Sequence, residues 1–222
     1  MNSRGAFVAI GLAVNLLVLA RGVILMLALG YADLGLVALV QAAITFSGLL
    51  HFGLLNGGYR LLCHAGERTQ QRIVDLAYSG FALIGAFIVL VALGYAATLG
   101  DATQRWVAGL AALGGMATLV RSWITNELVA RQKLKAANLI NAIAISVSLA
   151  TLGLLVPGVS SADPALVAVS AIVVQPVLFV ALALLSGAAL RPRALRTSRR
   201  LGAIIFKAGF VLFLTGLAIQ AM

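Results

Sequence analysis

Residues 6–54 read AFVAIGLAVNLLVLARGVILMLALGYADLGLVALVQAAITFSGLLHFGL. This sequence contains two apolar stretches, 6–29 and 34–54, separated by a short turn that includes Gly30 and Asp33. Each stretch is close to the roughly 20 residues that a helix needs to cross the hydrocarbon core of a bilayer. Because a short connection favours antiparallel neighbours, the sequence predicts a hairpin of two membrane helices here.

Five further apolar blocks follow, at 77–99, 106–128, 137–155, 164–190 and 204–221. The chain is 62% hydrophobic and 10% charged, with a mean hydropathy of +1.09, which excludes a soluble globular domain. We therefore expect an all-α integral membrane protein. Its parts are a six-helix bundle over 1–190, a basic cytoplasmic linker over 191–203 and a seventh membrane helix over 204–222. Pro176, preceded by Gln175, falls inside the sixth block and is expected to kink it.

The basic residues lie on alternate sides of these blocks. The N-terminus and every second connection carry most of them: Arg4, Arg60, Arg68, Arg72, Arg131, Lys133, Lys135, Arg191, Arg193, Arg196, Arg199, Arg200 and Lys207. The other connections carry Asp33, Asp101 and Asp163, with Arg105 as their positive charge. Since cationic loops stay in the cytoplasm, the pattern predicts a cytoplasmic N-terminus.

The net charge of +10 has the same explanation. In a membrane protein, most of these charges set topology and contact anionic lipid headgroups, so we expect membrane lipids as partners and no nucleic acid. A cleaved signal peptide is the alternative for residues 1–30, but Arg21 interrupts that block. The single cysteine, Cys63, excludes an intramolecular disulfide.

Two arginines lie inside predicted membrane helices. Arg21 precedes Gly30 by nine residues, or about 13 Å at the rise of an α-helix. Arg121 shares a helix face with Gly114, Thr118 and Thr125. Each arginine has two readings: Arg21 faces a cavity or snorkels to the interface, and the Arg121 face lines water or forms a small-residue packing seam.

Other polar residues in the blocks are interpreted first as hydrogen-bonding links between helices. They are Asn15, Gln41, Asn138, Asn141, Ser148 and Thr151. No Asp or Glu lies deep in any block, whereas a transporter of cationic drugs usually needs such a carboxylate. Buried arginines suit an anionic substrate instead, because a guanidinium pairs with phosphate in a bidentate manner.

Catalytic motifs are missing. The sequence contains no Walker-type glycine loop, no His-Glu-x-x-His, no Gly-x-Ser-x-Gly and no spaced metal ligands around Cys63 and His64. We expect no enzymatic activity, no cofactor and no metal ion.

Residues 15–75 carry a family resemblance. The carrying features are Arg21-Gly22, the turn LGYADLGL at 29–36, Gln41 with Phe46, and FGLLNGGYR at 52–60, followed by a basic segment before the third block. This region resembles the opening of polysaccharide (O-antigen-type) flippases of the multidrug/oligosaccharidyl-lipid/polysaccharide exporter superfamily. Beyond residue 75 the resemblance rests on topology alone.

The resemblance implies a specific architecture and activity. It implies two helix bundles around a central cationic cavity, and alternating access that moves a polyprenyl-pyrophosphate-linked oligosaccharide across the bacterial inner membrane. It implies Arg21 and Arg60 as pyrophosphate partners or gate residues. We add Arg121 to the expected site because of the polar face that it shares with Thr118 and Thr125, and not because of the resemblance. Gln41 and Asn15 are the remaining candidates for lining the cavity.

The resemblance also implies a second bundle. We expect this chain to be the N-terminal lobe of a larger protein, one half of a split transporter, or a half that forms a homodimer. Three other functions stay open as alternatives: a drug exporter of the same superfamily, a non-transporting scaffold that binds glycan-assembly proteins, and a membrane-embedded glycosyltransferase or phosphatase.

Overall fold

The computed structural model describes residues 3–155, 163–194, 201–207 and 209–211. Within these ranges the chain is helical, without a strand. The elements are α1 (Ser3–Ala28), α2 (Tyr31–Leu49), α3 (Leu54–Leu62), α4 (Glu67–Thr98), α5 (Ala102–Ala130), α6 (Leu134–Leu152), a single 3₁₀ turn η1 (Gly153–Leu155) and α7 (Pro164–Leu185).

Six of the helices are long and apolar enough to cross a membrane. These spans are Ala9–Ala28, Tyr31–Leu49, Glu67–Thr98, Ala102–Ala130, Leu134–Leu155 and Pro164–Leu185. The predicted all-α membrane bundle is thus confirmed at the level of six apolar helices in a multi-pass arrangement. The predicted seventh helix is described only over 201–207 and 209–211, which are helical. The remainder of that prediction, and residues 195–200 of the linker, lie outside the described residues.

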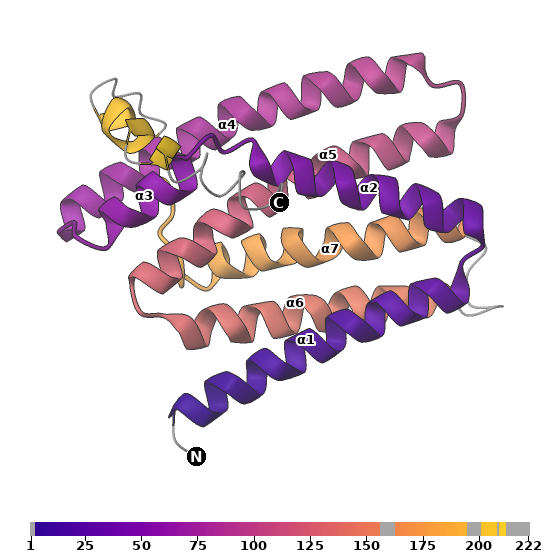
Figure 1. Cartoon of the computed structure of the whole chain (residues 1–222), viewed down its shortest axis with the longest axis horizontal. Coiled ribbons are helices and arrows are strands. Elements are labelled where there is room, and N and C mark those ends of the chain that lie inside the picture. Colours follow the sequence, from indigo (N-terminus) through magenta and orange to yellow (C-terminus); the bar gives the residue numbers. More distant parts are fainter. Residues whose placement is uncertain (1–2, 156–162, 195–200, 208, 212–222) are drawn as a thin grey trace.

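Helices α5 and α7 form the centre of the bundle (Figure 1). Helix α7 packs against α5 and α6, while α5 also contacts α2 and α4, and α1 packs on α6. Short connections therefore do produce packed hairpins for α4–α5 and α6–α7.

The same expectation is wrong for α1 and α2, which separate beyond their turn. In a bilayer there is no hydrophobic driving force that holds two apolar helices together. Each helix therefore packs against the neighbour that offers closer packing or hydrogen bonds. Helix α2 presses Ile44 and Ser47 against Gly114 and Gly115 of α5, where a side chain on either glycine would clash.

The two ends of the bundle differ in charge. At one end, here called the acidic end, Asp101 accepts hydrogen bonds from the backbone N–H groups of Thr103 and Gln104, and Asp163 accepts one from Ala165. These N-caps start α5 and α7. The opposite, basic end holds Arg60, Arg68, Arg72, Arg131, Lys133, Lys135 and Arg191. The alternating charge pattern thus becomes two chemically distinct faces.

The basic end also contains more helix than hydropathy predicts. The second apolar block is divided at residues 50–53, where Gly53 has a φ of 86° and starts α3. Helix α4 begins at Glu67, ten residues before the predicted apolar block. Its first turns expose Arg68 and Arg72 and bury Ile73, so this segment is an amphipathic extension that a hydropathy window reads as a loop.

The helical residues 201–207 and 209–211 lie against α3 through glycine contacts. A Cβ atom at Gly57 would overlap the main-chain oxygen of Ile205, and one at Gly209 would overlap that of Gly53. Ile205 is fully buried in this contact. The backbones approach closely because these positions lack side chains, as in small-xxx-small helix pairs.

We expect Gly57→Ala to destabilise the protein by about 1–3 kcal/mol, because the added methyl group forces the two backbones apart. Denaturation in detergent, followed by tryptophan fluorescence, measures this change. Gly66→Ala is the matched control, since nothing lies within 4 Å of a Cβ at Gly66. Equal stability of the two variants would contradict the close contact.

Candidate functional site

A layer of polar side chains crosses the bundle between two apolar clusters. On α7 it contains Gln175, which lies between Val173 of one cluster and Phe179 of the other. On α6 it contains Asn141 and Ser148. The layer therefore interrupts an apolar interior near the middle of the central helix.

Arg21 joins this layer from α1. Its Nη1 donates to the Gln175 Oε1 at 2.7 Å and to the Ser148 Oγ at 3.3 Å. Ser148, fully buried, donates in turn to the backbone oxygen of Ala171. The arginine thus points into the bundle toward α6 and α7, and these bonds help to explain why α1 packs on α6.

Arg121 joins the same layer from α5. Its Nη2 donates to the Asn141 Oδ1 at 2.9 Å, and its guanidinium carbon lies 5.4 Å from the centre of the Phe179 ring. That distance suits a cation–π contact. Ser122 and Thr125 on the same helix satisfy their hydroxyl groups locally, on the backbone oxygens of Thr118 and Arg121.

Gln175 links the two arginines. Its Nε2 donates at 3.3 Å to the Asn141 Oδ1, the same oxygen that accepts from Arg121. The result is a continuous chain from Arg21 through Gln175 and Asn141 to Arg121, built by four helices.

Both arginines lie deep in the bundle. Arg21 is seven residues from the acidic end of α1, about 10 Å, and Arg121 is nine residues from the basic end of α5, about 13 Å. Both arginines therefore lie about two helical turns or more from the nearer end of helices that are long enough to cross the hydrocarbon core.

The site carries two positive charges without a counter-charge. In the described part of the chain neither Arg21 nor Arg121 contacts a carboxylate, and all their hydrogen-bond partners are neutral. Holding an arginine at this depth costs at least a few kcal/mol. Neutral acceptors offset only part of that cost, so the arrangement favours an anionic ligand.

The other predicted site residues lie elsewhere. Asn15 and Gln41 are exposed on the outer faces of α1 and α2. Arg60 is exposed on α3, where it lines a surface hollow of about 530 Å³ with Asn56, Tyr59, Cys63 and His64. The structure brings Arg21 and Arg121 together and does not bring these three to them.

Gln175 is a site residue that the sequence pattern does not single out. Its only signal was its position before Pro176 in an otherwise apolar helix, and α7 runs continuously through that proline. Asn141 and Ser148 were interpreted as links between helices, which they are, but each also contacts a charged side chain.

His51, between α2 and α3, has an environment that favours its neutral form. Burial lowers the pKa of this imidazole below its usual value, although a backbone hydrogen bond works in the opposite direction. Its Nδ1 accepts from the Gly53 backbone N–H at 3.1 Å, an arrangement that requires the unprotonated nitrogen. These contacts stabilise the turn that starts α3.

A separate groove of about 540 Å³ lies between α2 and α4, with α5 as its floor. Its lining is mainly aliphatic, with Phe87 and Tyr95 as the aromatic members, and it contains neither arginine. The groove suits hydrocarbon chains of the bilayer and is distinct from the polar layer.

Within the described residues there is also no cluster of three His, Cys, Asp or Glu that would hold a metal ion. The chain matches no known family profile, no curated protein and no solved structure. Its function must therefore be argued from the polar layer itself.

Proposed function

We propose that this chain takes part in moving a polyprenyl-pyrophosphate-linked oligosaccharide across the bacterial inner membrane. In this proposal Arg21 and Arg121 receive the pyrophosphate at mid-membrane, and alternating access exposes them first to the cytoplasm and then to the outside. The N-terminus and the basic end lie in the cytoplasm, as the distribution of Lys and Arg favours.

One observation carries this proposal: two arginines at membrane depth share a hydrogen-bonded network that contains no carboxylate. Pyrophosphate offers several anionic oxygens, which match the planar donor pattern of guanidinium groups. A cationic drug would instead be repelled, which argues against the drug exporter. The flippase-like opening of the sequence, residues 15–75, supports the same substrate class.

Arginine replacements in the cell that produces the chain test this proposal. We expect Arg21→Gln and Arg121→Gln each to lower surface glycan about 10–100-fold, because each variant loses charged hydrogen bonds of about 1.5–3 kcal/mol to the substrate. The lipid-linked precursor should accumulate on the cytoplasmic leaflet. Surface labelling of the glycan and extraction of the precursor measure both quantities.

Arg105→Gln is the matched control, since Arg105 is exposed at the acidic end and donates to the Leu99 backbone oxygen. It should leave export unchanged. Normal export in both Arg21 and Arg121 variants would exclude transport through this site and favour the scaffold alternative. That alternative predicts instead that changes within 191–200 abolish capture of glycan-assembly proteins.

A further inference from the structure

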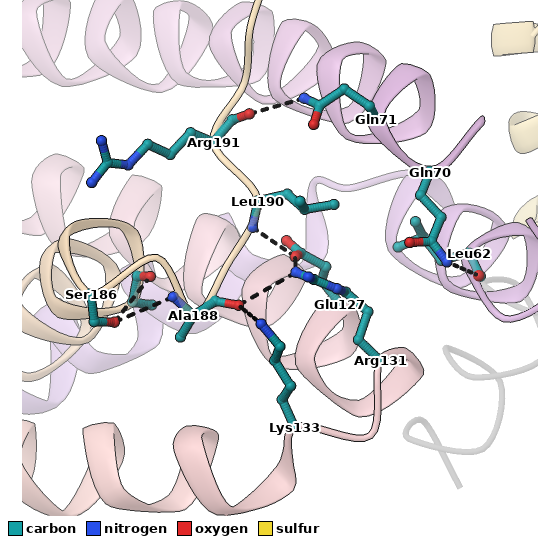
Figure 2. A network of polar contacts seen from close by, with 11 residues as sticks. Leu62, Gln70, Gln71, Glu127, Arg131, Lys133, Ser186, Ala188, Leu190 and Arg191 are labelled. Atoms are coloured by element: carbon teal, nitrogen blue, oxygen red, sulfur yellow. Dashed lines mark hydrogen bonds and ion pairs between the residues drawn. The ribbon is translucent and has the colours of Figure 1, made fainter. Parts of the chain in front are cut away.

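The chain that leaves α7 is held against the basic end of the bundle by side chains from three other places (Figure 2). Helix α7 ends at Leu185, and Gly187, with a φ of 67°, turns the backbone away. Residues 186–193 then cross the ends of the neighbouring helices. Residues 188–190 pack against the apolar core, whereas residues 186, 187 and 191–193 are exposed, so hydrogen bonds from neighbouring helices hold the exposed part of the segment.

Glu127 provides the first attachment. This side chain of α5 is fully buried, and its Oε1 accepts the Leu190 backbone N–H at 2.7 Å and the Arg131 Nη1 at 2.9 Å. Arg131 and Lys133 also donate to the Ala188 backbone oxygen, at 3.4 Å and 3.1 Å. One carboxylate and two cations thus hold both a donor and an acceptor of the departing backbone.

Asp75 provides the second attachment, from α4. It is 3% exposed, and its Oδ1 accepts the Arg193 backbone N–H and the Gln71 Nε2, both at 2.9 Å. The same Gln71 nitrogen donates to the Arg191 backbone oxygen at 2.9 Å. The second attachment therefore repeats the chemistry of the first, three residues further along the chain.

Two of the six acidic residues of the protein are thus buried and bonded to one short stretch of backbone. Charge-assisted hydrogen bonds are roughly twice as strong as neutral ones, and their strength depends on geometry. The bonds that one carboxylate accepts are therefore lost together when that carboxylate and the segment move apart. Among the described residues the Glu127 Oε2 is buried without a hydrogen-bond partner, so the closed arrangement leaves one acceptor unsatisfied. Residues 191–193 are exposed, and a segment without buried apolar side chains opens locally at low free energy.

We propose that Glu127 and Asp75 form a two-point latch that closes residues 186–193 onto the basic end, and that opening this latch frees the connection to the residues that follow. The closed latch ties the ends of α4, α5 and α7 and the α5–α6 turn into one unit. It fixes the direction in which the chain leaves α7 toward the segment that docks on α3. The open latch lets that segment move relative to the bundle without unfolding any membrane helix.

Cysteine accessibility tests the latch in the full chain, independently of any transport. In a Cys63→Ser background, Ala189→Cys places a thiol at a position that is 3% exposed inside the latch, and Ala144→Cys places one at a fully buried position on α6. The measurement is the rate of reaction with a water-soluble maleimide in inside-out membrane vesicles and in detergent.

We expect the thiol at position 189 to react slowly in this background. Glu127→Gln removes the ion pair and Asp75→Ala removes the second acceptor, so each should raise the rate at position 189 at least tenfold while position 144 stays unreactive. Gln71→Ala, at a half-buried residue, is the milder variant if Asp75→Ala fails to accumulate. Glu67→Gln removes an exposed carboxylate of α4 and should change neither rate.

Three results would overturn the latch. They are a fast reaction at position 189 in the background chain, an unchanged rate in the latch variants, and an equal rise at positions 189 and 144. The last would show that these carboxylates stabilise the whole bundle. The result of the export assay with the arginine variants does not affect these labelling rates. The latch and the proposed transport are therefore tested independently.

Discussion

Gln175→Glu is expected to abolish glycan export, by more than about 100-fold, while making the protein more stable. The substitution keeps the shape of the side chain and places a negative charge where Gln175 now accepts from Arg21 at 2.7 Å. It also replaces the Nε2 that donates to the Asn141 Oδ1 at 3.3 Å by an acceptor, a smaller loss than the gain of an ion pair with Arg21. The new carboxylate pairs with Arg21 and attracts Arg121 across Asn141. An anionic substrate must then compete with a permanent counter-charge for both arginines.

The gain in stability follows from the same pairing. Hydrogen bonds to a charged acceptor are stronger by about 1–2 kcal/mol than those to a neutral amide, which corresponds to about 2–8 °C in melting temperature for a chain of this size. Thermal unfolding in detergent and labelling of surface glycan measure the two effects. Gln104→Glu, at an exposed position in the first turn of α5, is the charge-matched control.

Gln175→Leu separates charge from hydrogen bonding. It removes the acceptor of Arg21 and leaves the site cationic, so we expect lower stability with substantial export retained. Inorganic pyrophosphate, used as a probe, should raise the melting temperature of the Gln175→Leu protein and not that of the Gln175→Glu protein. Full export by the Gln175→Glu protein would contradict a role for the positive charge.

How much of this site the sequence predicts depends on the kind of signal. Arg21 and Arg121 are conspicuous because each lies inside an apolar helix, where a charge needs a reason. Gln175 is not conspicuous, because a single amide in an apolar helix usually bonds to a neighbouring helix and nothing more. Gln175 matters because it lies between Arg21 of α1 and, through Asn141, Arg121 of α5. The spacing of residues along α7 does not predict this meeting of helices.

The sequence likewise predicts some features of the fold and not others. Hydropathy predicts the six long apolar helices that the described residues contain, since it depends on local composition. The orientation that charge alternation predicts stays a prediction. Neither pattern predicts that α1 leaves α2 for α6, because lipid covers apolar surface as well as a helix does. The polar bonds of Arg21 and the glycine contacts of α2 decide that choice. The early start of α4 is missed because an amphipathic extension has the mean hydropathy of a loop.

The largest expected change in stability concerns Arg131. Glu127 is fully buried, and the Arg131 Nη1 at 2.9 Å is its ion-pair partner, with the arginine side chain 23% exposed. Within the described residues, Arg131→Ala leaves a buried carboxylate with the Leu190 N–H as its remaining hydrogen-bond donor and with an unpartnered Oε2. Breaking a buried pair in this way is expected to cost about 3–5 kcal/mol, and denaturation in detergent measures it.

A double variant distinguishes an ion pair from simple loss of the arginine. Replacing both residues by Leu removes the uncompensated charge, so the Glu127→Leu/Arg131→Leu protein should be more stable than Arg131→Ala alone. It should still lose the latch, because no acceptor for the Leu190 N–H remains at position 127. Lys135→Ala, an exposed cation at the same end, should change stability by less than about 0.5 kcal/mol. If Arg131→Ala lowers the free energy of unfolding by no more than Lys135→Ala does, the buried Glu127 carboxylate does not need the ion pair with Arg131. The latch would then depend on its backbone hydrogen bonds alone.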